Sequence, residues 1–451
     1  MSSKASMPQI RTWLSEKSHA EKLFVAALAA YIFFYLPSLA AYRGAESLML
    51  LAFFWLVFVS GRKNGIRYLV LRDPFLLTCV AMLGFLLLAR LWYAYSLPPG
   101  IDPETRETRY VLKPFIVFII AFGMGIVARP YRWALLLLGA LGLLIYLLTT
   151  IGDGYWTMAL NGRREDFGIH NAQHTAMFTG TALIASVCFM ARAVRISTPF
   201  LRRAVMTFVA ITFTTSACVF IAAQTRAAWL GIFMASTIGL VTIACLARTK
   251  RGKPQRRTML VPAILILSGI MIAGINAPER VIASFSDQEI SLEQYASLPE
   301  YNANPRSSHG VRLLSWRMAL EWLKERPLLG WGPGSAEDLI DQSEYFSDQF
   351  KKTFGHLHSS LVESLVANGL IGTAILLVMV IWVGSATFIA HRNREMPDDV
   401  FVFALSFFGF WVAINFFESY TLYTTGHYIN AVVAGFIYSF YLQSHREDVS
   451  S

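Results

Sequence analysis

The chain has 451 residues, of which 55% are hydrophobic, 14% are aromatic and only 15% are charged. A soluble domain carries about a quarter charged residues, so this composition excludes a disordered, collagen-like, coiled-coil or small disulfide-rich protein and indicates a polytopic membrane protein. The net charge of +10 gives no reason to expect a nucleic-acid partner, because the meaning of a basic residue depends on the side of the membrane on which it lies.

Twelve apolar runs follow one another along the chain and predict an all-α polytopic membrane protein, because only helices satisfy the backbone in lipid over spans of about 20 residues. We expect transmembrane helices 1–9 within 1–277, a large outer loop at 278–357, and transmembrane helices 10–12 with a tail within 358–451. No cleavable signal peptide is evident before the second run. The runs are 23–41, 45–60, 75–95, 113–128, 133–151, 171–191, 204–223, 227–247, 258–277, 359–390, 400–420 and 427–443.

The distribution of basic residues predicts the orientation. With the N-terminus inside, most Lys and Arg residues of the short connections fall on the inner side, and the basic loop 248–257 serves as an anchor near anionic membrane lipids. The sequence therefore predicts a multi-pass protein with both termini in the cytoplasm. The irregular segments 96–112, 152–170 and 278–357 then lie outside.

The third of these outer segments is about eighty residues long, too long for an idle connection. It contains a predicted amphipathic helix at 311–326, in which Leu313, Trp316, Leu320 and Leu323 share one face. Such a helix could lie across the outer surface as a lid, or it could pack on the bundle, and the sequence leaves both open.

Several arginines occur at or beyond the outer ends of the predicted helices. A guanidinium at membrane depth costs a few kcal/mol unless it faces a cavity or a partner, and snorkelling to lipid headgroups is the alternative. Because the planar fork of arginine binds phosphate bidentately, this convergence predicts an anionic substrate. The principal pair is Arg226, in the turn 224–226, and Arg312; further substrate-binding candidates are Arg90, Arg163, Arg306, Gln224 and Trp316, whose ring can brace the stem of Arg312.

A pair of histidines precedes the tenth predicted helix. Ser360 and Glu363 have the spacing of a capping box, which places His358 just outside the helix N-terminus. The positive end of the helix disfavours imidazolium, so we expect His358 to be neutral at pH 7 and able to accept a proton. His356 is a substrate-binding candidate beside it.

Two alternatives remain for these histidines. His356 and His358 could form half of a metal site, with His170 and His174 as the other half. No cysteine and no clear acidic ligand lie nearby in the sequence, so we expect no metal. Structural hydrogen bonding is the second alternative, and it is the favoured interpretation of His170 and His174.

Three strings in chain order resemble the O-antigen ligase family, whose relatives include O-antigen polymerases and pilin oligosaccharyltransferases. The family usually has Asn where Ser359 stands and Glu where Ala367 stands. The strings are Thr-Arg-Ala-Ala-Trp at 225–229; Arg312-x3-Trp316-x2-Ala319 followed by Pro-Leu-Leu-Gly-Trp-Gly-Pro-Gly at 327–334; and His358-x2-Leu361 followed by Gly369-x2-Gly372.

This resemblance implies both a fold and an activity. The fold is the all-helical, multi-pass type of lipid-linked glycosyltransferases (GT-C type), with a large periplasmic loop over the site. The activity is transfer of a glycan from undecaprenyl pyrophosphate to a sugar hydroxyl of lipid A–core oligosaccharide. It takes place at the periplasmic face of the bacterial inner membrane, with no nucleotide, metal or other cofactor.

The residues suggest a mechanism for such a transfer. We expect a single inverting displacement, in which His358 is the base and Arg226 and Arg312 hold the pyrophosphate leaving group. An O-antigen polymerase or a protein O-oligosaccharyltransferase would share the donor and the fold. A polyprenyl-glycan transporter is the non-enzymatic alternative, which the lack of paired Gly/Pro-broken runs in two halves disfavours.

Overall fold

The computed structural model describes residues 16–60, 66–102, 113–248 and 308–450, and within these ranges the chain is helical and contains no strand. Every predicted apolar run except 258–277, which lies outside the described residues, overlaps a helix. The predicted all-α class is therefore confirmed. Within the described ranges, eight helices are long and apolar enough to cross a membrane, and Pro114–Val127 is a shorter apolar helix, so the count of twelve stays a prediction.

Local sequence signals set the starts of several helices. Ser18 and Glu21 form a capping box before α2, Asp73 caps α5 ahead of a proline in its first turn, and Asn171 caps α10. The bundle helices are α2 (His19–Phe34), α3 (Leu39–Phe54), α5 (Pro74–Ser96), α7 (Pro114–Phe122), α8 (Arg132–Thr149), α10 (Ala172–Val194), α11 (Pro199–Ala223), α12 (Arg226–Arg248), α19 (Ser360–Arg392), α20 (Asp398–Phe417) and α21 (Thr424–Ser450).

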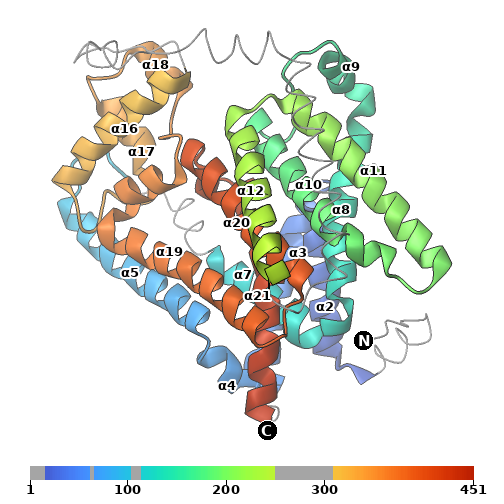
Figure 1. Cartoon of the computed structure of the whole chain (residues 1–451). Coiled ribbons are helices and arrows are strands. Elements are labelled where there is room, and N and C mark those ends of the chain that lie inside the picture. The colour runs from blue at the N-terminus through green and yellow to red at the C-terminus, as the bar shows by residue number, and fades with distance from the viewer. Residues whose placement is uncertain (1–15, 61–65, 103–112, 249–307, 451) are drawn as a thin grey trace.

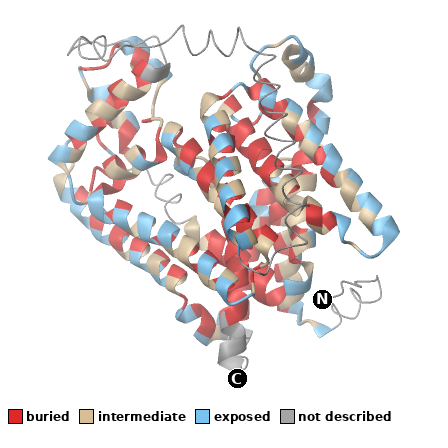
Figure 2. Ribbon diagram, in the orientation of Figure 1, coloured by how far each residue is buried: buried red, intermediate tan, exposed pale blue. Residues whose placement is uncertain are grey.

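Helix α21 runs through the middle of the bundle, where it packs against α7 and α19, while α12 packs against α20 and α10 against α11 (Figure 1). Buried residues concentrate along these contacts (Figure 2). The start of α2 and the end of α21 lie at one end of the bundle, and α16 (Ser308–Glu325), α17 (Ser335–Gln342) and α18 (Asp348–Thr353) lie at the other. The start of α2 and the end of α21 thus lie on the same side, which agrees with the predicted topology. Which compartment lies on that side stays a prediction.

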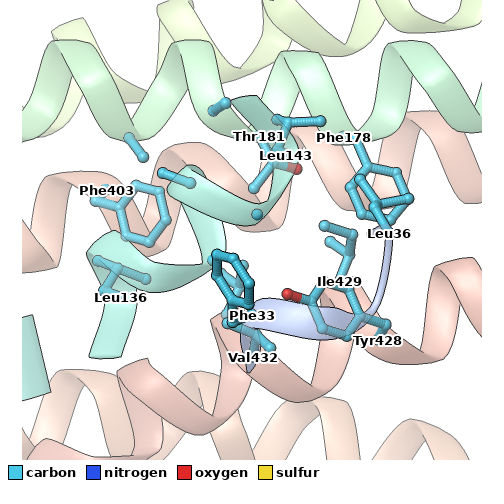
Figure 3. Close-up of a pocket in the computed structure, with 16 residues that line it drawn as sticks. Phe33, Leu36, Leu136, Leu143, Phe178, Thr181, Phe403, Tyr428, Ile429 and Val432 are labelled. Atoms are coloured by element: carbon cyan, nitrogen blue, oxygen red, sulfur yellow. The ribbon is translucent and has the colours of Figure 1, made fainter. Parts of the chain in front are cut away.

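A pocket inside the bundle lies among α2, α8, α10, α20 and α21 (Figure 3). Its walls are almost entirely apolar, and Phe33, Leu143, Phe178 and Val432 are among the lining side chains. The hydroxyl of Tyr428, which also lines the pocket, is used in a hydrogen bond to a backbone carbonyl of α2. Polar chemistry therefore has to be sought outside this pocket.

The segment 308–357 has a small hydrophobic core of its own, built from α16 to α18 and closed against the start of α19. Helix α16 confirms the predicted helix at 311–326, but the predicted apolar face is wrong. The buried face carries Val311, Leu314, Ala319 and Trp322, whereas Leu320 is 59% exposed. The buried face is set by this core, which also contains Trp331, and the helix is therefore packed on the bundle.

Helix α19 is broken at Gly369, whose φ of 60° and ψ of −168° are not helical. The segment 327–332 fills the break by pairing with the backbone groups that the break sets free, as such groups require at membrane depth. The glycine-rich string is thus a structural complement of the broken helix. Two hydrogen bonds are donated by the segment, from the N–H of Trp331 to the carbonyl of Val366 (2.9 Å) and from the N–H of Gly332 to the carbonyl of Ala367 (2.8 Å). Two are donated by α19, from the N–H of Leu370 to the carbonyl of Pro327 (2.8 Å) and from the N–H of Ile371 to the carbonyl of Leu328 (3.2 Å).

Replacing Gly369 by alanine should destabilise the fold. The added Cβ would lie 2.4 Å from the carbonyl oxygen of Leu328, and a residue with a side chain is strained at this φ and ψ by roughly 1–3 kcal/mol. We expect a clearly lower midpoint in thermal unfolding of the solubilised protein. Gly384→Ala is the control, because it lies in the same helix with no atom within 4 Å of the new methyl group. Equal midpoints for the two variants would contradict the role given to the break.

Candidate active site

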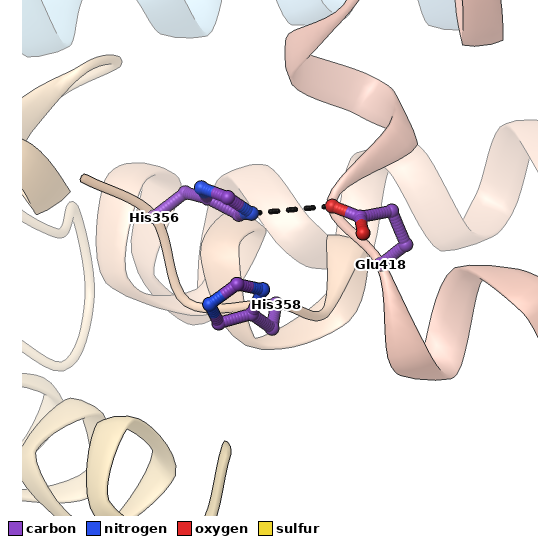
Figure 4. Close-up of side chains that lie close together, drawn as sticks. All are labelled: His356, His358 and Glu418. Atoms are coloured by element: carbon purple, nitrogen blue, oxygen red, sulfur yellow. Dashed lines mark hydrogen bonds and ion pairs between the residues drawn. The ribbon is translucent and has the colours of Figure 1, made fainter. Parts of the chain in front are cut away.

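A cluster of charged and aromatic side chains gathers where α10, α12, α19 and α21 begin and where α20 ends. Its centre is Glu418, in the linker 418–423 between α20 and α21, and His356 and His358 lie beside it on the segment that precedes α19 (Figure 4). One nitrogen of each ring and one oxygen of the carboxylate lie within 4.8 Å of one another. We call Glu418, His356 and His358, together with the side chains that interact with them, the polar cluster.

Glu418 is a buried carboxylate with partners on both oxygens. Its side chain is 2% exposed, and Oε1 lies 3.2 Å from Nε2 of His356, while Oε2 accepts a hydrogen bond from the Gln173 amide. Burial alone would raise the pKa of Glu418, but the hydrogen bond and the charge of His356 lower it to about 2. Glu418 is therefore an anion that belongs to the cluster.

The Glu418 carboxylate controls the charge of His356. Burial opposes the charge of this imidazole, but the hydrogen bond to Glu418 and the negative charge of that residue outweigh burial and raise the pKa of His356. The carboxylate therefore favours the protonated imidazole, and the two residues form a largely buried ion pair when His356 is protonated.

Replacing Glu418 by glutamine should change how stability depends on pH. His356 has a raised pKa in the folded protein, so its contribution to stability is fully present below its ordinary pKa and is lost as the pH rises through the raised value. In Glu418→Gln this loss should shrink, and the thermal midpoint should vary less between pH 6 and 9. Breaking the buried pair should also lower the unfolding free energy at pH 6 by roughly 3–5 kcal/mol.

The pair of His391 and Asp398 supplies the control for this experiment. Its nitrogen and oxygen are 3.0 Å apart at the opposite end of α19, and the Asp398 side chain is 32% exposed. Asp398→Asn should cost no more than about 1 kcal/mol, as for exposed pairs. A wild-type pH profile in Glu418→Gln would contradict the ion pair.

His358 is a neutral imidazole, as the sequence predicts, although for a different reason. Burial first, and then the charge of His356, lower its pKa to about 3. The ring centroids of the two histidines are 4.1 Å apart, and Nε2 of His358 is buried without a hydrogen-bond partner. The backbone of His358 is left-handed, with φ of 54°, a conformation that costs energy and is often found at functional sites.

The predicted capping box at Ser360 and Glu363 is wrong. The N-cap of α19 is Ser359, with no side-chain cap, because the two predicted capping side chains have other partners. The Glu363 carboxylate accepts hydrogen bonds from the N–H of Leu357 at 2.9 Å and the hydroxyl of Ser419 at 3.3 Å. Glu363 thus joins the His356–His358 segment to the Glu418 linker.

Arg312 reaches the polar cluster from α16. Its Nε and Nη2 donate to the carbonyl oxygen of Phe417 at 3.2 Å and 3.1 Å, and its guanidinium lies 5.9 Å from the centre of the Phe417 ring. Burial lowers the pKa of Arg312, whereas the charge of Glu418 raises it. Phe417 therefore braces Arg312, and Trp316 has another role: its Nε1 donates to the carbonyl of Leu357 at 3.0 Å, next to His358.

Arg226 is the first residue of α12 and follows a turn that is locked to the loop 161–165. Gln224 has φ of 46°, and its amide donates to the carbonyl of Gly162 at 3.1 Å. The N–H of Glu165 donates to the carbonyl oxygen of Ala222 at 3.2 Å. Gln224 therefore has a structural role in holding the two segments together.

The same loop brings Arg164, and not its neighbour Arg163, to the polar cluster. Nε of Arg164 donates to the carbonyl of Ala223 at 3.3 Å, and its guanidinium interacts electrostatically with Glu418 and Arg226. The surrounding protein partly desolvates Arg164 and lowers its pKa, and the charges of Arg164 and Arg226 both act on Arg312. The three guanidinium groups thus interact electrostatically. Arg163 and Arg164 are both exposed, and the hydrogen bond to Ala223 is what distinguishes Arg164.

The remaining arginine candidates are placed differently. Arg90 is exposed on α5 beside exposed Leu91 and Trp92, which favours the snorkelling interpretation. Arg306 lies outside the described residues.

The structure brings His170 and His174 to the polar cluster. Their rings are 4.6 Å apart, and Tyr423 of the linker lies 4.3 Å from His170 and 4.9 Å from His174. His174 is fully buried, with Nδ1 2.5 Å from the hydroxyl of Thr425. This hydrogen bond agrees with the interpretation of His174 as a residue that serves structural hydrogen bonding.

The expectation that no acidic group lies near the histidines is wrong, because Glu418 lies beside both His356 and His358. Glu418 is the only acidic residue between Asp399 and Glu447. An acidic residue near the outer end of the predicted apolar run 400–420 was the signal that could have identified it. Here the carboxylate and His356 bond directly to each other, and we interpret the group as an ion pair. That no metal is required stays a prediction.

The fold is a multi-pass α-helical bundle of membrane type with a cluster of arginine, histidine and glutamate at one end. Residues 208–377 match the family model described as O-antigen ligase. The match includes Arg226, Arg312 and His358, and it confirms the family resemblance over this segment. It supports ligase- or polymerase-type glycan chemistry in general, and no curated protein matches the chain.

Proposed function

We propose that the protein is an O-antigen ligase. It transfers a glycan from undecaprenyl pyrophosphate to a sugar hydroxyl of lipid A–core oligosaccharide on the periplasmic side of the inner membrane. The proposal is supported by the electrostatic interaction of Arg312 with a neutral imidazole, His358, and with a second guanidinium group, that of Arg226. The family match over 208–377 supports the same chemistry.

The reaction is a single displacement at the anomeric carbon of the donor sugar. The acceptor hydroxyl gives its proton to Nε2 of His358, and its oxygen forms the new bond to the anomeric carbon. The bond from this carbon to the pyrophosphate oxygen breaks, and the electron pair stays on that oxygen. Arg226 and Arg312, with Arg164 beside them, stabilise the charge that develops there. The anomeric centre is inverted.

Donor binding would make His358 a stronger base. The positive charges of His356 and Arg312 contribute to the low pKa of His358. A bound pyrophosphate compensates these charges, which favours the protonated imidazole and raises its pKa. The acceptor hydroxyl is therefore activated only when the donor is in place.

The test of this function is transfer by the purified protein. Donor and lipid A–core oligosaccharide are mixed with the protein in detergent without added nucleotide, and the products are identified by mass spectrometry. We expect lipid A–core carrying the glycan, together with free undecaprenyl pyrophosphate. Extension of the lipid-linked glycan would instead indicate a polymerase. Modification of an added pilin would indicate a protein O-oligosaccharyltransferase, and the absence of any reaction would favour a polyprenyl-glycan transporter.

A further inference from the structure

The displacement proposed above requires a place for the ring of the donor sugar. Its anomeric carbon is bonded to a pyrophosphate oxygen near the arginines and is approached by the acceptor oxygen near His358, so the ring must lie between these groups. Several side chains in this region are aromatic rings, and their arrangement indicates what they bind.

Tyr423 is the hub of these aromatic rings. Its ring centroid lies 4.3 Å from that of His170, 4.9 Å from that of His174 and 6.0 Å from that of His356. His356 in turn contacts His358 at 4.1 Å. A continuous series of aromatic rings therefore leads from the proposed base to His170. The ring of His170 also interacts electrostatically with Glu418 and with Asp166, two residues after Arg164.

His170 is the accessible end of this series. It is exposed and has a left-handed backbone with φ of 58°, which the hydrogen-bonded loop around it must maintain at an energetic cost. The surrounding protein still desolvates part of the ring and lowers the pKa of His170 below its ordinary value. The ring is therefore mostly neutral at pH 7, with one donor and one acceptor nitrogen.

A second observation points to a ligand at this place. The fully buried His174 backs the rings of both His170 and Tyr423, and its Nε2 is buried without a hydrogen-bond partner. A buried polar atom of this kind marks a position where a polar ligand group or a water completes the structure.

We propose that His170 and Tyr423 form the subsite for the first sugar of the donor glycan, the sugar that is bonded to the pyrophosphate. This inference rests on the proposed function. Aromatic faces pack against the C–H face of a pyranose, and the neutral imidazole nitrogens hydrogen-bond its hydroxyl groups, a combination typical of small-molecule sites.

The test compares two ligands that differ only in the sugar. Affinities of purified His170→Ala and Tyr423→Ala are measured for the glycan-bearing undecaprenyl pyrophosphate donor and for undecaprenyl pyrophosphate itself. We expect affinity for the donor to fall roughly five- to ten-fold, the range of a lost aromatic contact, while affinity for undecaprenyl pyrophosphate is unchanged. His170→Phe and Tyr423→Phe keep an aromatic face and should retain most of the donor affinity and a wild-type thermal midpoint.

An equal loss for both ligands would assign His170 and Tyr423 to the pyrophosphate and overturn the sugar subsite. So would a loss of affinity for lipid A–core alone. Because these measurements follow binding, they remain decisive if the wild-type protein transfers no glycan, a result that would reject the proposed ligase activity by itself.

Discussion

Replacement of His358 by alanine should reduce the rate of glycan transfer by about 10²–10⁴-fold, the contribution of a positioned base. The unpaired Nε2 of His358 is the atom that we expect to take the acceptor proton. Its loss should lower kcat with both substrates still bound, because the arginines that hold the pyrophosphate remain. The measurement is transfer in vitro, together with capped lipopolysaccharide in cells that produce equal amounts of the protein.

His391→Ala is the matched control, because His391 lies at the opposite end of α19 and stacks on Phe401 at 4.0 Å. It should transfer glycan at the wild-type rate. Normal transfer by His358→Ala would remove the base assignment. The cluster would then act through its charges alone, and His356→Ala would become the more damaging change.

Helix positions could be predicted from the sequence because they depend on local properties. Apolar runs of the right length mark the spans, and periodicity marks the helix that became α16. The buried face of α16 could not be predicted in the same way. It is chosen by Trp331 and by residues of α17 and α18, which are distant enough along the chain that no pattern within the helix encodes the choice.

The residues of the candidate site also divide into those that local sequence motifs indicate and those that only contacts between distant segments bring together. His358, Arg226 and Arg312 were identified by their motifs, whereas Glu418 was missed because its contact with His356 joins residues 62 positions apart. Arg163 and Arg164 are neighbours in an irregular loop. Only hydrogen bonds to the turn at 222–224 decide that Arg164 faces the cluster, and such contacts leave no signal in a single sequence.

Replacement of Arg312 by glutamine should reduce kcat by about 10²–10³-fold, since a donor placed at the leaving oxygen contributes roughly 3–4 kcal/mol to the transition state. Arg312→Lys should restore little. Two N–H groups of the guanidinium donate hydrogen bonds to the carbonyl of Phe417. Lysine can neither form this pair of hydrogen bonds nor present a planar edge to phosphate. The same reasoning applies to Arg226→Lys. Single-turnover transfer at saturating donor measures the effect.

Arg317→Gln is the control, because Arg317 lies in the same helix with its guanidinium 5.5 Å from the Tyr345 ring and outside the polar cluster. Its transfer rate should be that of the wild type. If Arg312→Lys were as active as the wild type, a point charge would suffice and the bidentate geometry would be wrong. If Arg312→Gln were fully active, the leaving group would have to be stabilised by Arg164 and Arg226 alone, and their double variant would then carry the whole loss.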